Sequence, residues 1–306
     1  MSIYHYCLVD VFTDRAFGGN PLAVFPDARG LSSELMQALA KEFNLSETSF
    51  VLPPQKPGNG FQVRIFTPAS ELPMAGHPTV GTAFVLARKQ LIKMTEPTTS
   101  IIFEEGVGDI AVTLKTLPNQ HLSIQMRQPL PTFGEQFRDR AAIAELLSLS
   151  LEDLDPALPC EVVSCGVPFL FVPLKNLAAA HAIRFRQDVW ERVLRDFSAS
   201  QVFAFTREVE TPGSTVHSRM FAPALSVPED PATGAASGPL GCYLVRHKLV
   251  EGTASARIVS EQGLEMGRPS FIQIEIDSVG DAITGVYISG QCHFMGEGSM
   301  EVPASL

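Results

Sequence analysis

Three ionisable residues lie beside turns from which a side chain can reach a small ligand. Glu47 follows the predicted end of a helix, His77 follows Gly76, and Asp230 comes four residues before Gly234. Burial raises the pKa of a carboxyl group, which suits a group that both accepts and donates a proton. Glu47, His77 and Asp230 are therefore the catalytic candidates. Structural roles stay open for each: Glu47 as a surface acid, His77 bonded to backbone, and Asp230 as a helix cap.

Gly76 and Gly234 each stand just before a predicted helix. Unpaired backbone N–H groups and the helix dipole favour an anion at such a point. Neither stretch has the P-loop signature, and no G-x-G-x-x-G follows a strand, so a carboxylate fits better than a nucleotide. The alternative is that both glycines serve only tight turns.

These turns belong to two stretches, 64–92 and 219–250, that are similar to each other. Each contains R-x-F-x-P, a Pro-containing loop, a Gly turn and a helical pattern, at 78–88 and 235–247. At constant spacing, identical residues recur as Glu71 and Glu229, Pro73 and Pro231, Gly76 and Gly234, Leu86 and Leu244, Arg88 and Arg246, and Leu91 and Leu249. Chance is the alternative, because Gly, Pro and Leu are common here. We predict a duplicated domain with a pseudo-two-fold axis.

The elements around these motifs predict an α+β fold. Both helices are apolar on several faces, as expected for a helix that a sheet surrounds. Strands are predicted at 4–12, 22–25, 48–52 and 61–66, and a helix with a Ser32 or Ser33 cap ends at Asn44. We expect two pseudo-symmetric lobes, each a curved, mostly antiparallel sheet or barrel around a central helix. Their limits are 1–127 and 128–306, with a linker at 128–134; whether the last strand, 293–302, returns to the N-terminal lobe is left open.

Length and charge restrict the class of protein. The 306 residues suffice for two domains, and the net charge of −10 with a pI near 5.2 opposes binding to nucleic acid. The chain begins without a basic segment and an apolar signal core, and its apolar runs are too short to span a bilayer. We expect a cytoplasmic protein with no nucleic-acid partner and no membrane.

Cysteine and histidine spacing gives little support to metal or thiol chemistry. The five cysteines form no C-x-x-C pair, and the seven histidines include no H-E-x-x-H and no close grouping in the sequence. No G-x-S-x-G nucleophile turn is present. The sequence therefore predicts no metal site.

A set of motifs resembles the phenazine-biosynthesis PhzF-like isomerase family over nearly the whole length. The motifs are VDVFTDRAFGGNPLAVF, FNLSETSFVLPP, RIFTPASELPMAGHPTVGTA, RMFAP, EDPATGAASGPL and QGLEMGRPS, in this order. The resemblance implies the diaminopimelate-epimerase-like fold, with the site between two lobes, and a homodimer.

The family's phenazine enzyme isomerises trans-2,3-dihydro-3-hydroxyanthranilate by moving a proton between ring carbons, without a cofactor. The resemblance makes Glu47 the acid and base, and it makes His77 and Asp230 the groups that orient and polarise a small carboxylate-bearing substrate. It assigns Ser46 and the backbone of Gly76, Gly234 and Ala235 to substrate binding.

One position departs from the pattern. The family usually has Ser after Gly234, where this chain has Ala235, so a hydroxyl contact worth about 1 kcal/mol would be absent. Two alternatives to the isomerase follow. One is a binding or regulatory protein that keeps the cleft without efficient catalysis. The other is an amino- or hydroxy-acid epimerase, in which His77 or Asp230 supplies a second base.

Overall fold

The computed structural model describes residues 1–95, 97–118, 120–251 and 254–305. The chain forms two compact units, unit 1 with Met1–Arg127 and Ser289–Leu306, and unit 2 with Gln128–Ile288. Within the described part, no helix has the length and apolar character that crossing a membrane requires. All five cysteines are free thiols, and all but Cys292 are buried.

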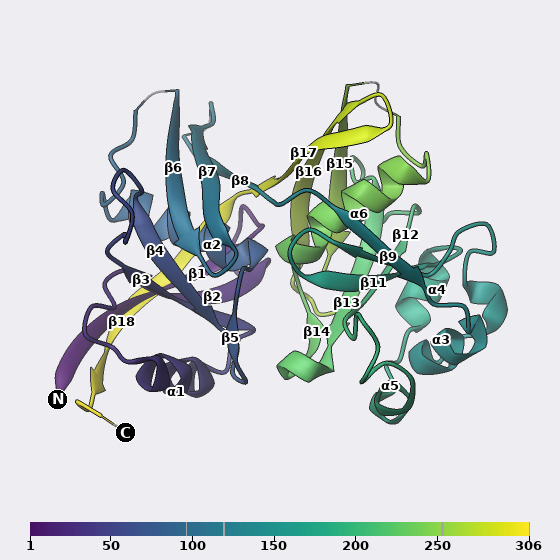
Figure 1. Ribbon diagram of the computed structural model, residues 1–306, viewed down its shortest axis with the longest axis horizontal. Coiled ribbons are helices and arrows are strands. Elements are labelled where there is room, and N and C mark those ends of the chain that lie inside the picture. Colours follow the sequence, from purple (N-terminus) through teal and green to yellow (C-terminus); the bar gives the residue numbers. More distant parts are fainter. Residues whose placement is uncertain (96, 119, 252–253, 306) are drawn as a thin grey trace. The chain divides into compact units, whose positions relative to one another are not determined.

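In the described residues of unit 1, the strands pack with two helices (Figure 1). Its elements are β1 (Ser2–Val11), β2 (Asn20–Phe25), α1 (Ser33–Phe43), β3 (Glu47–Leu52), β4 (Phe61–Phe66), β5 (Glu71–Leu72), α2 (Gly76–Arg88), β6 (Thr98–Glu105), β7 (Gly108–Thr116), β8 (Leu122–Arg127) and β18 (Cys292–Val302). The last strand, whose place the sequence left open, pairs with β1 from Ser2↔Val302 to Val11↔Cys292.

Unit 2 has a similar sheet with additional helices. Its strands are β9 (Thr132–Gln136), β10 (Glu161–Ser164), β11 (Pro168–Pro173), β12 (Val202–Thr206), β13 (Val216–Ala222), β14 (Val227–Asp230), β15 (Ser255–Gln262), β16 (Ser270–Val279) and β17 (Ala282–Gly290). Its helices are α3 (Arg140–Leu147), α4 (Leu177–Ala182), α5 (Gln187–Val193) and α6 (Gly234–Arg246), with short 3₁₀ turns at Leu151–Asp153 and Pro223–Leu225.

The strands of the two units repeat one pattern of pairing. In unit 1 the order β18-β1-β2-β3-β4-β6-β7 is joined by antiparallel, antiparallel, parallel, antiparallel, parallel and antiparallel pairs. In unit 2 the order β9-β10-β11-β12-β13-β15-β16 has the same succession. The predicted duplication and the α+β class are thus confirmed, with β18 in the position that β9 holds in unit 2.

A helix lies at the centre of each unit, as predicted. Helix α2 contacts β1, β2, β3, β7, β8 and β18, and all of it except Phe84 and Arg88 is buried. Gly81 lets it approach the sheet, because a Cβ there would lie 2.6 Å from a Leu22 methyl carbon and 2.7 Å from one of Val11. Helix α6 contacts β10, β11, β15 and β16 in the same manner. These helices contain the residue spacing that the two repeats share, and their first turns hold the motif glycines.

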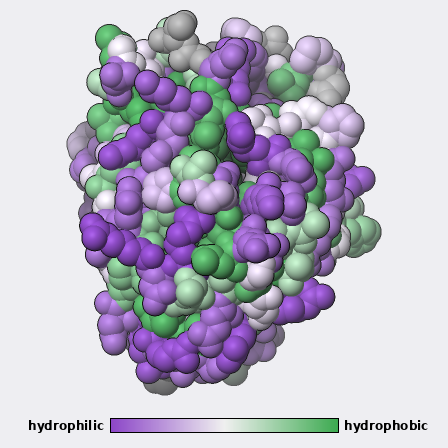
Figure 2. Space-filling view, turned by 90° about the vertical axis from the view of Figure 1, so that its right-hand side faces the viewer, coloured by the Kyte–Doolittle hydropathy of each residue, from purple (hydrophilic) through white to green (hydrophobic). Residues whose placement is uncertain are grey.

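Outer helices cover each sheet from its other side. Helix α1 has Ser32 as its N-cap and ends at Asn44, whose φ of 50° is left-handed, as the sequence predicts. In unit 2, α3 and α5 pack together and α4 contacts β12 and β13. Their inward side chains, among them Ile143 and Trp190, join one buried cluster. On the face in Figure 2, hydrophilic side chains predominate and hydrophobic ones show in small groups between them.

Two elements differ from the sequence prediction. The expected linker at 128–134 is a linker only up to β9, because Phe133 lies opposite Val163 in the β9–β10 pair. The sequence pattern predicts a helix at 142–151, but helix α3 begins earlier, after an Asp139 cap, and ends earlier, where Ser148 takes a left-handed φ of 57°. A Pro-rich segment can still enter a sheet at its edge, which composition alone does not reveal.

Candidate functional site

Glu47 and His77 come together in unit 1. Glu47 begins β3, three residues after the left-handed Asn44, and His77 is the second residue of α2. Oε2 of Glu47 lies 3.3 Å from Nε2 of His77, whose side chain is almost fully buried. Strand β3 and helix α2 are joined at this point by the 2.8 Å hydrogen bond between the hydroxyls of Ser49 and Thr82.

Asn20 determines which nitrogen of His77 carries the proton. Nδ2 of Asn20 lies 3.2 Å from Nδ1 of His77. Because an amide nitrogen only donates, Nδ1 accepts, and the ring proton is on Nε2, the atom that faces Glu47. Burial lowers the pKa of His77 to about 3, so the ring is neutral at physiological pH. His77 therefore presents an uncharged N–H beside the Glu47 carboxyl group.

The sequence prediction did not include Asn20. It ends the loop that contains Gly19, where φ is +63° and a Cβ would lie 2.3 Å from Val11 O. The carboxylate of Asp10 holds the same loop by accepting the Phe17 N–H at 2.9 Å. The available signal was a polar residue within FGGNP, between two apolar strands. A turn motif rich in Gly and Asn is, however, explained equally well by the turn itself.

Asp230, Gly234 and Ala235 come together in unit 2. Asp230 is the buried last residue of β14, and the Thr233 hydroxyl donates to its Oδ2 at 2.5 Å. Gln262 Nε2 donates to Asp230 O at 2.6 Å and to Thr233 Oγ1 at 2.9 Å. Asp230 is thus held in place by the loop before α6. It does not cap this helix, whose N-cap is Thr233.

Both central helices begin without a side-chain cap. Ala75, the N-cap of α2, offers no polar side chain, and the Thr233 hydroxyl at the start of α6 is directed to Asp230. The first backbone N–H groups of a helix then need another acceptor, and the helix dipole favours an anionic one. Ala235 is half-buried in the first turn of α6, and Ser46 is half-buried just before β3. These positions agree with the predicted substrate-binding role, which stays a prediction.

Glu71 and Glu229, which recur in the two repeats, have the same structural role in both units. The Arg64 guanidinium donates to both oxygens of Glu71 at 2.7 and 2.6 Å. In unit 2, Arg219 donates to Glu229 at 2.8 Å twice. These acids are not among the catalytic candidates, and the bidentate pairs explain why both repeats contain them.

Glu105 is a buried acid that the sequence prediction missed. Desolvation raises its pKa to about 8, against a hydrogen bond from Thr79 that lowers it. The Thr79 hydroxyl lies 2.6 Å from both Glu105 Oε1 and Ala75 O. The Thr79 hydroxyl is the donor to both oxygens, which share its one proton. Glu105 therefore fastens the first turn of α2 as a neutral acid, and unit 2 has the neutral Gln262 at the corresponding place.

Comparisons with known proteins point in one direction. The family model described as "Phenazine biosynthesis-like protein" matches residues 9–298. A trans-2,3-dihydro-3-hydroxyanthranilate isomerase of Pseudomonas aeruginosa is 36% identical over 97% of this chain and 99% of that protein. One from Pseudomonas chlororaphis is 37% identical, with the same shares.

Solved structures agree. A phenazine biosynthesis protein of the PhzF family from Bacillus anthracis has a TM-score of 0.89 and 27% identity, and the match covers 99% of this chain and 100% of that one. A hydroxyproline epimerase from Agrobacterium vitis shares the fold at a TM-score of 0.66 and 12% identity, over 97% of this chain and 92% of that one. With its matched motifs, its repeated sheet and its two central helices, the chain belongs to the phenazine-biosynthesis PhzF-like family of isomerases.

Proposed function

We propose that the protein is a cofactor-independent isomerase that moves a proton between two carbons of a small cyclic carboxylate. The substrate class is that of trans-2,3-dihydro-3-hydroxyanthranilate, which the relatives' names state for those proteins. The observation that carries the proposal is the 3.3 Å approach of the Glu47 carboxyl group to the buried, neutral His77.

In the proposed reaction Glu47 is first a base and then an acid. Its carboxylate takes a proton from one ring carbon, and the electron pair of that C–H bond enters the conjugated system of the substrate. The Glu47 carboxylic acid then returns the proton to a second carbon. No atom is gained or lost and no oxidant is needed. A neutral His77 suits this cycle because an imidazolium would hold Glu47 as an ion pair and weaken it as a base.

The remaining residues would bind the substrate. The uncapped N-termini of α2 and α6, at Gly76 and at Gly234 and Ala235, supply backbone N–H groups for its carboxylate. Asp230, held in place by Thr233, would accept a hydrogen bond from a polar substituent of the substrate. Ser46, which immediately precedes Glu47 in the sequence, would also bind the substrate. We expect a homodimer as well, on the family resemblance.

A direct test is turnover of trans-2,3-dihydro-3-hydroxyanthranilate, followed by the loss of its diene absorbance. Glu47→Gln keeps the shape of the side chain but cannot accept a proton, so kcat should fall by roughly 10³-fold or more. Binding, measured by the thermal shift that the substrate causes, should change little. Glu42→Gln removes an exposed acid of α1 and should keep wild-type turnover.

The outcomes separate the proposal from its main alternative. Comparable turnover by Glu47→Gln and wild type would exclude Glu47 as the acid and base. Binding without turnover in the wild type would instead favour a binding or regulatory protein, for which Ala235 in place of the usual Ser is the motivating residue.

A further inference from the structure

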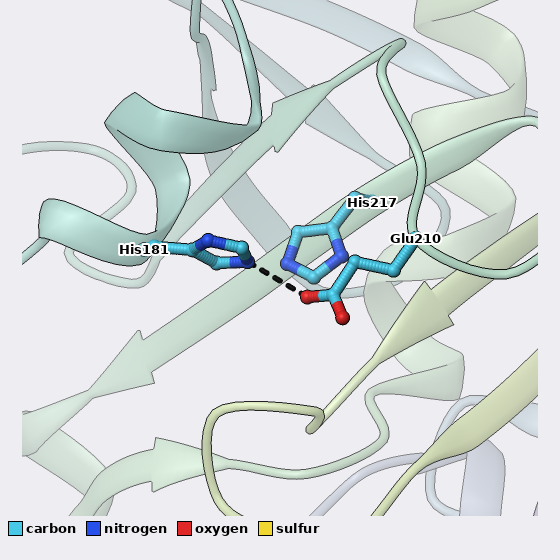
Figure 3. Close-up of side chains that lie close together, drawn as sticks. All are labelled: His181, Glu210 and His217. Carbon is cyan, nitrogen blue, oxygen red and sulfur yellow. Dashed lines mark hydrogen bonds and ion pairs between the residues drawn. The ribbon is translucent and has the colours of Figure 1, made fainter.

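Unit 2 contains a cluster of two histidines and two carboxylates separate from the residues described above. Nε2 of His181 lies 2.7 Å from Glu210 Oε1, and Nε2 of His217 lies 2.8 Å from Glu265 Oε1. His181 Nε2 is also 3.9 Å from Glu265 Oε1. Figure 3 shows the rings of His181 and His217 and the Glu210 carboxylate directed toward one another. The four side chains come from α4, the β12–β13 loop, β13 and the β15–β16 turn.

The spacing of these donors fits a metal ion. Ligand atoms of His181, Glu210 and His217 all lie within 4.8 Å of one another. Around a tetrahedral zinc ion with bonds of about 2.0–2.2 Å, ligand atoms are separated by roughly 3.3–3.6 Å. The histidine–carboxylate separations of 2.7, 2.8 and 3.9 Å lie on both sides of this value, so metal binding requires the side chains to adjust. His181 and Glu210 are about half-exposed and can make this adjustment, while the buried His217 provides the fixed ligand.

A buried carboxylate orients two of the four ligands. Glu261 Oε1 accepts from His217 Nδ1 at 3.0 Å and from the backbone N–H of Glu210 at 2.6 Å. With Nδ1–H bonded to Glu261, the Nε2 atom of His217 faces the cluster. A carboxylate behind a ligating imidazole is the usual outer arrangement in zinc proteins, because it fixes the tautomer and the direction of the ring.

Arg219 holds the backbone of the helix that contains His181. Arg219, two residues after His217 in β13, donates from Nη1 to Ala180 O at 2.9 Å. The same atom is 3.4 Å from Ile183 O, so the guanidinium holds the backbone on both sides of His181. The cluster thus rests on supports that hold its members in place.

Unit 1 shows that the fold does not require this cluster. Glu104 accepts the backbone N–H groups of Gln55 and Lys56 at 2.7 Å, just as Glu261 accepts those of Glu210 and Thr211. Gln62 is opposite Glu104 in the β4–β6 pair, where His217 is opposite Glu261 in the β13–β15 pair. Unit 1 therefore has the loop-anchoring glutamate, Glu104, but it has Gln55 and Gln62 where unit 2 has Glu210 and His217. The ligand residues of unit 2 are additional to what the shared scaffold needs.

We propose that His181, Glu210, His217 and Glu265 bind one divalent first-row transition-metal ion. Two imidazoles favour zinc, iron, nickel or copper over magnesium and calcium, and two carboxylates balance the charge of the ion. Because all four ligands come from the protein, the site is structural, and the ion fastens α4 to the β12–β13 loop and the β15–β16 turn. The sequence prediction of no metal site did not consider this cluster, because its four members are spread over residues 181–265.

Zinc is the probe for the test, added to the full-length, metal-stripped protein in competition with a chromophoric chelator. We expect one zinc ion per chain and a higher melting temperature in its presence. His181→Ala and Glu210→Gln alter half-exposed side chains, so both variants should fold, as circular dichroism would verify. Each should bind zinc at least tenfold more weakly and lose the metal-induced rise in melting temperature.

A matched control uses another histidine–glutamate pair of unit 2. His247 Nε2 lies 2.8 Å from Glu161 Oε2. Among the described residues, this pair does not belong to the cluster of His181, Glu210 and His217. His247→Gln should bind zinc like the wild type. Cobalt substitution gives an independent readout: visible bands of a tetrahedral ion in the wild type, absent from His181→Ala. Binding below one equivalent, or equal binding by the wild type and both cluster variants, would overturn the proposal.

Discussion

At the scale of single residues, a hydrogen bond behind His77 decides its chemical state. Asn20 donates a hydrogen bond to Nδ1 of His77, and burial keeps the ring neutral with a pKa of about 3. The proton on Nε2 then faces Glu47 at 3.3 Å. A base with an uncharged neighbour keeps its affinity for a proton, which an imidazolium in the same place would reduce. The neutral His77 is therefore part of how unit 1 prepares Glu47.

Asn20→Asp tests this arrangement. A carboxylate at this position would accept from Nδ1 and favour the charged ring, so the pKa of His77 should rise by several units. An imidazolium would pair with Glu47, and kcat should fall by about 100-fold. Histidine side-chain NMR reports the tautomer and the pKa, and turnover reports the rate. Asn44→Asp adds the same charge at an exposed site of unit 1 and should change neither. An unchanged His77 spectrum in Asn20→Asp would contradict the assignment.

At the scale of elements, the start of each central helix is fastened by a residue from the strand that follows it. Gln262 of β15 holds Thr233 and the Asp230 backbone before α6, and Glu105 of β6 holds Thr79 in α2. The two fastening residues follow the equivalent loop-anchoring acids Glu104 and Glu261. Gln262 is an uncharged amide, and Glu105 is an acid whose raised pKa keeps it protonated and therefore also uncharged.

This difference predicts a pH dependence for unit 1. The pKa of Glu105 is raised from 4.5 to about 8 in the folded protein, so the fold stabilises its protonated form. That contribution is fully present below about pH 4.5 and is lost as the pH rises through about 8. Glu105→Gln cannot lose a proton. Relative to the wild type, it should therefore gain stability between pH 5 and pH 9, by up to about 4 kcal/mol.

Urea unfolding of both proteins at pH 5, 7 and 9 measures this effect. The difference between the two free energies of unfolding cancels the other titrating groups, which both proteins share. A constant difference across these pH values would show that Glu105 is ionised in the fold. The same series on Gln262→Glu tests the pair from the other side, since a new acid there should make unit 2 lose stability as the pH rises.

At the scale of the whole molecule, the end of the chain completes the sheet at its beginning. Strand β18 pairs with β1 from Ser2 to Val11, and in this way takes the place that β9 has in unit 2. The N-terminal part alone lacks this strand of the repeated pattern. The strand pairing of unit 1 is therefore complete only when residues near both ends of the chain are present.

Removal of residues 292–306 should prevent unit 1 from folding. The truncation exposes the edge of β1 and removes a strand that also contacts α2. We expect aggregation or loss of the cooperative unfolding transition, measured by circular dichroism and by amide exchange within β1–β4. Removal of residues 303–306 alone, which lie after β18, should leave the melting temperature within a few degrees of the wild type. A stable, cooperative chain ending at Gln291 would show that β18 is dispensable.

The sequence by itself determined the duplication, the two central helices and the positions of Glu47, His77 and Asp230 beside their turns. These features depend on local periodicity, on Gly and Pro at fixed places and on self-similarity, which a sequence displays directly. Glu71 and Glu229 were likewise visible as residues that recur in both repeats.

Tertiary structure alone decided which residues meet across long separations. Asn20 reaches His77, β18 reaches β1, and His181 joins Glu210, His217 and Glu265, through packing between segments that are distant in the chain. It also decided the protonation of Glu105, because desolvation depends on what surrounds a side chain. Contacts and burial of this kind arise from packing in three dimensions, and the order of residues shows them only where a repeat or a motif happens to mark them.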